Sequence, residues 1–417
     1  RKFIWDMMAV KVGGKNIIAS SLYPKEGNPL WEEYSTRVVA HTLKVYSKYT
    51  FDYPYPKAVS VHSKNQGMEY PMICWNYGRP NEDGSYSDRT KYAMISVIIH
   101  EVGHNFFPMI VNSDERQWGW MDEGLDSFVQ YLTEQEFEED YPSRRGDPSK
   151  IVRYMSGDQD FISPIMSNPE NVYQLGPNAY SKPATALNIL RETIMGPELF
   201  DFSFKTYAKR WKFKHPTPED FFRTMEDASA VDLDWFWRGW FYSTDVVDIG
   251  VKSVDKYVIS DKPSKEIDSI LAKYGMTAND LNPTVFMQKK TKESKENSEM
   301  ESDSISSFEA LETSLGDDKK LPKHFYEIQF EKPGGLVMPI IVDYIYEDGT
   351  KERIEYPVQI WRKNDSVVKR LITSDKKLIG IELDPDAETA DINLNNNSWP
   401  ENNNISDFDK FKEKIKG

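Results

Sequence analysis

The sequence predicts an α+β protein in which a mixed N-terminal part is followed by a β-rich C-terminal part. Two apolar segments with helical spacing flank a polar loop at residues 112–117, and residues 147–242 continue in a largely helical pattern. From about residue 324 to 395 the pattern changes to short alternating runs separated by turn residues. A length of 417 residues is typical of two to three domains.

The first third of the chain alternates predicted strands and helices. Residues 1–22 are expected to form β structure around the turn residues Gly13 and Gly14. A helix over 32–47 and strands over 57–62 and 68–75 follow. A strand edge that carries Gly67 and Met68 suits peptide binding, because an extended peptide adds to an open edge through main-chain hydrogen bonds.

The next segments are predicted to be helices and end in a strand. The helices are expected at 182–195, 197–211, 218–228 and 233–241. The third has a clear start signal, since Thr217 is a good N-cap with Pro218 at the first helical position and Asp220 at the third. Residues 246–260 alternate like a strand.

The C-terminal part is predicted to be a small β sandwich. Its strands are expected at 325–330, 340–346, 355–361 and 378–383, with turns such as Glu347-Asp348-Gly349 between them. Residues 289–320 are polar and nearly free of large apolar side chains, which predicts a flexible insert. A short terminal helix is expected within 408–416.

The most informative stretch is His100-Glu101-Val102-Gly103-His104. Residues four apart on an α-helix lie on one face, so both imidazoles can reach one metal ion. The glutamate after the first histidine can then reach a water on that metal. The pattern is typical of a zinc peptidase.

A catalytic zinc ion needs a third protein ligand and an open position. Glu123, with 18 residues between it and His104, is the candidate. Pro108 should end the first helix near residues 107–111, and a second helix is expected from about 121 to 138. An antiparallel helix pair of this kind would bring Glu123 back to the histidines.

Together with Trp120-Met121-Asp122-Glu123-Gly124, this spacing resembles the gluzincin aminopeptidases of the aminopeptidase N type. Gln66-Gly67-Met68-Glu69-Tyr70 resembles that family's exopeptidase motif Gly-x-Met-Glu-Asn, with Tyr70 in place of asparagine. The segment 178–184 resembles the one that carries the family's catalytic tyrosine, and 2–6 resembles the junction after its N-terminal β domain. Leu125 and Pro183 also depart from the commoner residues of their motifs.

The resemblance implies a thermolysin-like zinc peptidase catalytic domain, a small β-sheet plus helices, followed by a β-sandwich-like domain. The expected boundaries are 1–22 for a β junction after an N-terminal domain that the chain lacks, 23–245 for the catalytic domain, 246–320 for a connecting segment with the polar insert, 321–400 for the β-sandwich-like domain and 401–417 for a tail. The lack of an initiator methionine and of a signal peptide adds to the expectation of a fragment or processed chain.

The expected chemistry is hydrolysis of the N-terminal peptide bond of a peptide. His100, His104 and Glu123 would hold one Zn²⁺, and Glu101 would act as general base and then as acid. By the resemblance, Tyr180 donates a hydrogen bond to the oxyanion. Glu69 would pair with the free α-ammonium of the substrate, and Gly67 and Met68 would contact its main chain.

Each of these residues also has a purely structural interpretation. Glu123 could be a solvated acid at a helix start, where the helix dipole favours carboxylates. Glu69 could be a surface acid at a strand edge, and Tyr180 a core tyrosine. Asp126 and Ser127 either orient a ligand or lie on a helix surface. The remaining histidines lack ligand-spaced neighbours and are expected to be structural or exposed: His41, His62, His215 and His324.

Composition limits the partners and the compartment. A formal net charge of −15 argues against nucleic acid, whose phosphates require clustered Lys and Arg. No apolar run reaches the roughly 18–20 residues of a membrane span, which indicates a soluble chain. The single cysteine, Cys74, excludes an intrachain disulfide and fits a cytoplasmic or an exported protein equally.

Two other functions remain open at this point. The same zinc site could serve an endopeptidase or a hydrolase of a non-peptide substrate. A catalytically inactive gluzincin scaffold that binds peptides or partner proteins is the alternative from another class. A third possibility is an inactive fragment with intact ligands, since a missing N-terminal domain could supply part of the cleft. The sequence leaves the preferred N-terminal residue, the natural substrate, the compartment and the oligomeric state undetermined.

Overall fold

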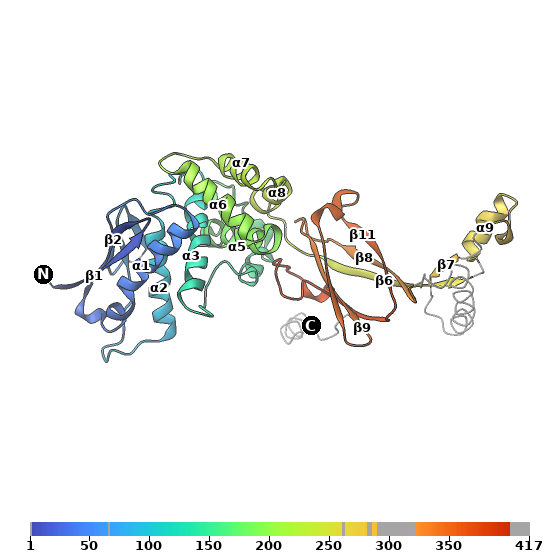
Figure 1. The fold of residues 1–417 in the computed structure, drawn as a ribbon, viewed down its shortest axis with the longest axis horizontal. Helices are drawn as coiled ribbons and strands as arrows, with labels where there is room; N and C mark the ends of the chain where they lie inside the picture. Colours follow the sequence, from blue (N-terminus) through green and yellow to red (C-terminus); the bar gives the residue numbers. More distant parts are fainter. Residues whose placement is uncertain (1, 66, 261–262, 282–285, 290–321, 401–417) are drawn as a thin grey trace. The chain divides into compact units, whose positions relative to one another are not determined.

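The computed structural model describes residues 2–65, 67–260, 263–281, 286–289 and 322–400 (Figure 1). The chain divides into two compact units, Arg1–Val246 with Ala387–Ile392 and Val247–Asp386 with Asn393–Gly417. Most of the predicted polar insert, residues 290–320, and the predicted tail and terminal helix, residues 401–417, lie outside the described residues.

The first unit contains a five-stranded sheet of order β1-β2-β3-β5-β4. Its strands are β1 (Phe3–Val12), β2 (Lys15–Pro24), β3 (Lys57–His62), β4 (Met68–Tyr70) and β5 (Ile73–Asn76). The β1–β2 hairpin turns at Gly13 and Gly14, where φ is positive as this turn requires. Because β2 also pairs in parallel with β3, residues 3–24 belong to this sheet, whereas the sequence suggested a separate junction over 1–22.

Residues 68–76 form two antiparallel strands, β4 and β5, where the sequence predicted one strand over 68–75. The chain reverses at Pro71 and Met72, and Met72 adopts a φ of 68°. Pro71 has no backbone N–H for a sheet ladder, so a continuous strand is disfavoured there. In this sheet β4 is an edge strand, and peptide binding beside Gly67 and Met68 requires such an edge.

Helices cover the rest of the first unit. The longer ones are α1 (Leu30–Tyr49), α2 (Asp88–Gly103), α3 (Leu125–Phe137), α5 (Lys182–Ile189), α6 (Pro197–Trp211), α7 (Pro218–Ser229) and α8 (Asp234–Tyr242). Shorter segments are η1 (Lys25–Gly27), η2 (Trp120–Gly124), η3 (Pro148–Lys150), α4 (Val152–Met155), η4 (Gln159–Phe161), η5 (Pro169–Asn171), η6 (Gly176–Ser181) and η7 (Leu190–Met195). The predicted N-cap position of Thr217 is confirmed, and Thr217 and Asp220 form a capping box in which each side chain bonds the other's backbone.

Helix α2 ends at Gly103, several residues before the predicted end at 107–111. After Gly103 the hydrogen bonds tighten to a three-residue spacing, from Asn105 to Val102 and from Phe106 to Gly103. This tighter turn buries Phe106 and Phe107 completely in the core. A regular helix through 104–108 is also incompatible with the ring of Pro108, which would clash with the carbonyl of His104.

The second unit contains two four-stranded sheets, of orders β10-β9-β12-β13 and β11-β8-β6-β7. The strands are β6 (Gly250–Ser260), β7 (Phe286–Lys289), β8 (His324–Glu331), β9 (Ile340–Tyr346), β10 (Lys351–Tyr356), β11 (Val367–Ser374), β12 (Leu378–Leu383) and β13 (Ser398–Trp399). Helical segments are α9 (Lys265–Lys273), η8 (Ala278–Asp280), η9 (Val358–Arg362) and η10 (Leu394–Asn396). The two sheets contact each other, since Leu378 N–H donates to the Tyr326 hydroxyl and the rings of Phe330 and Tyr356 lie 6.1 Å apart.

Four details of the C-terminal part of the chain differ from the sequence prediction. Strand β6 pairs with β8, so residues 250–260 belong to a sheet and not to a connecting segment. The predicted strand 355–361 stops at Tyr356, because Pro357 leads into the helical turn η9. Strand β11 was not predicted. Residues 387–392, expected in the β-sandwich-like domain, belong to the first unit, where Thr193 donates to the carbonyl of Glu388.

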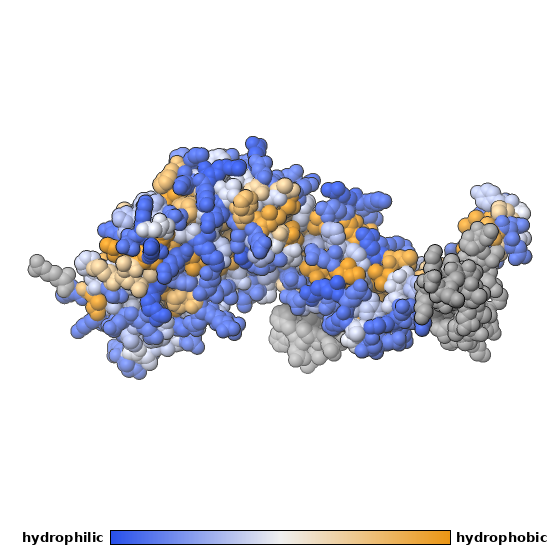
Figure 2. Space-filling model, viewed as in Figure 1, coloured by the Kyte–Doolittle hydropathy of each residue, from blue (hydrophilic) through white to orange (hydrophobic). Residues whose placement is uncertain are grey.

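The view in Figure 2 shows a mostly hydrophilic surface with scattered hydrophobic patches, as a net charge of −15 favours. Among the described residues, no helix combines the length and the apolar character that crossing a bilayer demands. The large apolar side chains are instead concentrated in the interiors of the two units.

Candidate metal centre

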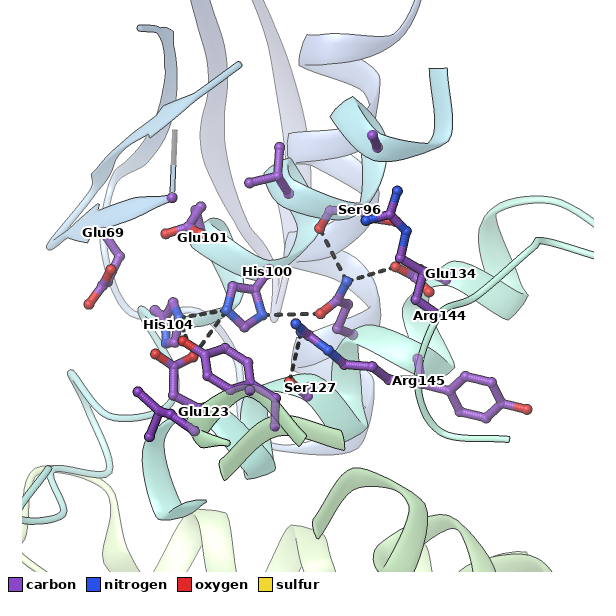
Figure 3. Close-up of a pocket in the computed structure, with 18 residues that line it drawn as sticks. Glu69, Ser96, His100, Glu101, His104, Glu123, Ser127, Glu134, Arg144 and Arg145 are labelled. Carbon is purple, nitrogen blue, oxygen red and sulfur yellow. Dashed lines mark hydrogen bonds and ion pairs between the residues drawn. The ribbon is translucent and has the colours of Figure 1, made fainter. Parts of the chain in front are cut away.

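Three side chains from two neighbouring elements converge at one point of the first unit (Figure 3). The Nε2 atoms of His100 and His104 lie 3.1 Å apart. Glu123 Oε2 lies 3.1 Å from Nε2 of His100 and 3.4 Å from Nε2 of His104. His100 is in α2 and His104 caps its end, whereas Glu123 comes from η2, so the predicted helix pair does bring the three residues together.

This triangle has the dimensions of a zinc site. Zinc binds imidazole nitrogen and carboxylate oxygen at about 2.0–2.2 Å, so two ligand atoms of a tetrahedral site lie roughly 3.3–3.5 Å apart. The three observed distances, 3.1, 3.1 and 3.4 Å, are close to that edge length. Two imidazoles and one carboxylate are also the donor set of catalytic zinc, which leaves the fourth position for water or substrate. The residues therefore fit one Zn²⁺.

The outer nitrogen of His100 is held by two side chains of α3. Its Nδ1 lies 2.7 Å from Asp126 Oδ2 and 3.1 Å from Gln130 Oε1. Asp126 is fully buried, and the Tyr46 hydroxyl donates to its Oδ1 over 2.9 Å. Acceptors at Nδ1 keep the proton there and direct the lone pair of Nε2 toward the metal position.

His104 is oriented in the same way. Its Nδ1 lies 3.0 Å from the carbonyl oxygen of Phe107 and 3.0 Å from Asp122 Oδ1. The carbonyl is available because the chain leaves the helix after Gly103. Both rings thus present Nε2 to the same point, and both are buried, with 8% of His100 and 1% of His104 exposed.

The electrostatics of the centre favour a cation. Burial disfavours the charged imidazolium of His100, yet the charge of Asp126 and the hydrogen bonds with Asp126 and Glu123 together outweigh this and raise the pKa of His100 to about 9. Although burial also favours neutral Glu123, its hydrogen bonds with His100 and His104 hold the pKa of this carboxyl well below its usual range. An environment that stabilises positive charge on buried imidazoles also stabilises a divalent ion between them.

Glu101 and Glu69 lie on one side of the histidines (Figure 3). Carboxylate oxygens of both lie within 4.8 Å of each other and of a His104 ring nitrogen. Glu101 is 4% exposed, and its Oε2 has no hydrogen-bond partner within the described part of the chain. Burial raises the pKa of Glu101 to about 7, although the two imidazoles oppose the rise. A carboxylate with this pKa can both accept and release a proton near neutral pH.

The structure divides the predicted substrate-binding residues between two faces of β4. Gly67 and Glu69 line the cavity of the metal centre, and a side chain at Gly67 would lie 3.5 Å from Glu101 Oε1. Met68 lines a separate surface depression with Tyr70 and Trp75. Because successive side chains of a strand point to opposite faces, the Met68 side chain does not enter the cavity. Contact of the Gly67 and Met68 backbone with the main chain of a substrate stays a prediction.

Tyr180 lies in η6 and lines the same cavity. Its ring stacks on that of His100, with centroids 5.7 Å apart, and the guanidinium of Arg145 lies 4.6 Å from its centroid. Burial and the neighbouring charge of Glu123 raise the pKa of Tyr180 far above its usual range. The phenol therefore keeps its proton and remains a hydrogen-bond donor at any physiological pH.

One cavity of about 600 Å³ is lined by Glu69, His100, Glu101, His104, Glu123 and Tyr180. Sequence reasoning proposed Asp126 and Ser127 as supporting groups but did not find Gln130, Asp122, Tyr46 or Arg145. Gln130 follows Asp126 at i+4 on α3, so helical spacing from Glu123 could have indicated it. Tyr46 and Arg145 come from distant segments, and no local pattern marks them.

Comparisons with known proteins agree with this site. Residues 34–240 match the peptidase family M1 domain. Aminopeptidase N of Lactococcus lactis subsp. lactis is 21% identical over 243 residues, which cover 54% of this chain and 28% of that protein. Glutamyl aminopeptidase of Sus scrofa is 30% identical over 160 residues, 37% of this chain and 17% of that protein. The matched parts thus span less than a third of these relatives.

The fold is similar to that of a solved structure, Legionella pneumophila aminopeptidase A in complex with aspartic acid. The TM-score is 0.57 at 12% identity, over 93% of this chain and 38% of the other. At this identity the likeness concerns the fold alone. Together with the sequence match over residues 34–240, it confirms the resemblance to the aminopeptidase N type: the chain carries a domain of peptidase family M1.

Proposed function

We propose that the chain is a zinc-dependent aminopeptidase that hydrolyses the N-terminal peptide bond of peptides. The observation that carries the proposal is the triangle of His100 Nε2, His104 Nε2 and Glu123 Oε2, with sides of 3.1–3.4 Å. The aminopeptidase names of the relatives support the same activity.

His100, His104 and Glu123 are the residues that hold Zn²⁺ in this proposal. When bound, zinc polarises a carbonyl oxygen and activates water near neutral pH. Glu101 accepts the proton of the attacking water and then delivers it to the leaving amine. The unpartnered, buried Oε2 of Glu101 and a pKa of about 7 suit both steps.

Tyr180 supplies the hydrogen bond to the oxyanion that forms at the attacked carbonyl. Its hydroxyl stays protonated because burial and Glu123 raise its pKa. A donor already in place costs no reorganisation when charge develops, and removing one such donor typically slows turnover by about 10²–10³.

Glu69 selects the free end of the substrate. An N-terminal α-ammonium can pair with its carboxylate, whereas an internal amide or an acetylated end cannot. Gly67, on the same face of the edge strand β4, lets the substrate main chain approach close to Glu101. The anchor at Glu69 then places the first peptide bond of the substrate at the metal.

The catalytic residues all lie in the first unit, and they favour an aminopeptidase over the two alternative functions. We infer that the first unit is a thermolysin-like catalytic domain and the second a β-sandwich-like domain. An inactive scaffold would be expected to lack a ligand or the base, and this chain has His100, His104, Glu123 and Glu101. An endopeptidase would have no use for a carboxylate at the position of Glu69.

A screen of amino-acid amides tests the proposal. Purified protein with a measured zinc content should hydrolyse some free amides, lose that activity to a chelator and regain it when zinc is added back. N-acetylated forms of the same amides should resist. Cleavage of free and acetylated substrates at equal rates would identify an endopeptidase, and zinc-loaded protein that cleaves no free amide would support the scaffold.

A further inference from the structure

Arg145 lines the cavity at the end away from Glu69 (Figure 3). Its Nη1 donates to Ser127 Oγ over 3.3 Å, and its guanidinium lies against the ring of Tyr180. Within the described residues, no carboxylate lies within ion-pair distance of this guanidinium. Most of its five N–H donors are therefore available, although burial of the group lowers its pKa.

The acidic groups nearest to Arg145 are already engaged elsewhere. Asp126 contacts His100 and Tyr46, and Glu123 contacts both histidines. Glu134 accepts hydrogen bonds from Gln130 and Ser143, one at each carboxylate oxygen, and its burial raises its pKa. A part-buried guanidinium that lines a cavity and has no counter-ion of its own would stabilise an anion supplied from outside.

The backbone around Arg145 is fixed by the next residue. Gly146 has a φ of 91°, and a Cβ at this position would lie 2.3 Å from the ring of Tyr131. Only glycine allows the chain to lie against Tyr131, another residue of the cavity wall. The packing of Gly146 against Tyr131 thus fixes the backbone next to Arg145, which suits a side chain that must hold a ligand in one position.

The two ends of the cavity therefore carry different charged residues. Glu69 and Glu101 lie at one end, the metal ligands in the middle, and Arg144 and Arg145 at the other end. With the substrate ammonium at Glu69 and its first peptide bond at the metal, the residue released by hydrolysis extends toward Arg145.

We propose that Arg145 binds a carboxylate of the residue that follows the scissile bond, so that the enzyme prefers substrates that carry a negative charge on this residue. The carboxylate has two possible sources, the C-terminal α-carboxylate of a dipeptide or an acidic side chain of the second residue. The inference rests on the proposed aminopeptidase activity. A cavity of about 600 Å³ is ample for a dipeptide.

Three substrates with the same N-terminal residue X, chosen from the amide screen, test the proposal: the dipeptide X-Ala, its amide X-Ala-NH₂, and X-Asp-NH₂. The wild-type protein should prefer X-Ala or X-Asp-NH₂ to X-Ala-NH₂. Relative to X-Ala-NH₂, Arg145→Gln should lower kcat/KM by about 10- to 100-fold, mainly through KM, for the substrate whose carboxylate Arg145 binds. Loss confined to X-Ala identifies the α-carboxylate, and loss confined to X-Asp-NH₂ identifies the side chain.

A matched control removes the same charge elsewhere. Arg153, an exposed residue of α4, can be changed to glutamine and should leave all three rates unchanged. If Arg145→Gln slows all three substrates equally, Arg145 only positions Tyr180 and the proposal is wrong. It is equally wrong if none of the three rates changes.

Binding separates this inference from the proposed activity. In the Glu101→Gln background, which should bind without turnover, we would titrate X-Ala and X-Asp-NH₂ by calorimetry. For the substrate whose carboxylate Arg145 binds, the Kd should be about 10- to 100-fold lower than in the Glu101→Gln/Arg145→Gln protein. Equal dissociation constants of the two proteins for both substrates would overturn the carboxylate site even if the enzyme is active. An Arg145-dependent difference without hydrolysis by the wild-type protein would instead overturn only the proposed activity.

Discussion

Asp126 Oδ2 lies 2.7 Å from Nδ1 of His100, and the other oxygen of this carboxylate accepts a hydrogen bond from Tyr46. Tyr46, His100 and Asp126 come from α1, α2 and α3, so one buried carboxylate joins all three helices that surround the metal centre. The orientation of a metal ligand and the packing of the core therefore depend on the same group.

Replacing Asp126 by asparagine should weaken zinc binding. The amide keeps the size of the side chain but removes the charge that favours a metal-oriented His100, and loss of such a partner typically costs about 10- to 100-fold in metal affinity. Competition with a chelator measures this change. Glu139→Gln, at an exposed position after α3, is the charge-matched control; equal zinc affinity of wild type and Asp126→Asn would contradict the role assigned to Asp126.

Gly103→Ala should disturb the same contact sterically. A Cβ at Gly103 would lie 2.1 Å from Asp126 Oδ1 and 2.3 Å from the Tyr46 hydroxyl, so both must shift. We expect the free energy of unfolding to fall by about 1–3 kcal/mol, as is usual for an overpacked core. Denaturant unfolding measures it, with Gly176→Ala as the control, since a Cβ there meets nothing within 4 Å. An unchanged unfolding midpoint would show that the three helices are not tightly packed at this point.

Glu101→Gln should separate zinc binding from turnover. Glutamine cannot accept the proton of the attacking water, and loss of a general base typically lowers kcat by about 10²–10⁴. Because His100, His104 and Glu123 remain, elemental analysis should find one zinc per chain. Full activity of this variant would exclude Glu101 as the base.

Glu69→Ala should lower the preference for free N-termini. The α-ammonium loses a charge-assisted hydrogen bond, so kcat/KM for free amides should fall by about 10- to 100-fold. Zinc content should stay normal, because Glu69 is outside the ligand triangle. Acetylated and free substrates would then differ less than in the wild type. A variant that still discriminates fully between them would remove Glu69 as the anchor.

Lys182 gives the stability of the chain a specific dependence on pH. It is 1% exposed, its Nζ donates to the carbonyl of Ser243, and burial lowers its pKa from 10.5 to about 8. Between these two values the unfolded chain binds more protons than the folded chain, so this group makes unfolding harder as pH rises. Below about pH 8 the full cost of the buried charge is present.

Lys182→Met should remove that dependence. The unfolding free energy of wild type minus variant should increase between pH 8 and 10.5 by up to about 3 kcal/mol. Urea unfolding at several pH values measures the difference, and Lys209→Met, at an exposed position of α6, should show none. A pH-independent difference for Lys182→Met would mean that the lysine is charged in the fold throughout this range.

The sequence by itself determined the elements and residues that local spacing controls. The four-residue separation of the histidines, the position of Glu123 in the following helix and the N-cap Thr217 of α7 are properties of short segments, and the structure has all of them. The edge position of β4 was also within reach, because a short strand between turn residues has few other places in a sheet.

Only the tertiary structure decided which distant side chains complete the centre. Tyr46 reaches Asp126 across 80 residues of sequence, and Arg145 stacks on Tyr180 through packing of a loop against a helical turn. The tertiary structure also decided that β6 pairs with β8, more than 60 residues later in the sequence. It decided as well which face of β4 lines the cavity, and the Met68 side chain lies on the other face. Such contacts depend on which surfaces are buried together, and no periodicity along the chain encodes that choice.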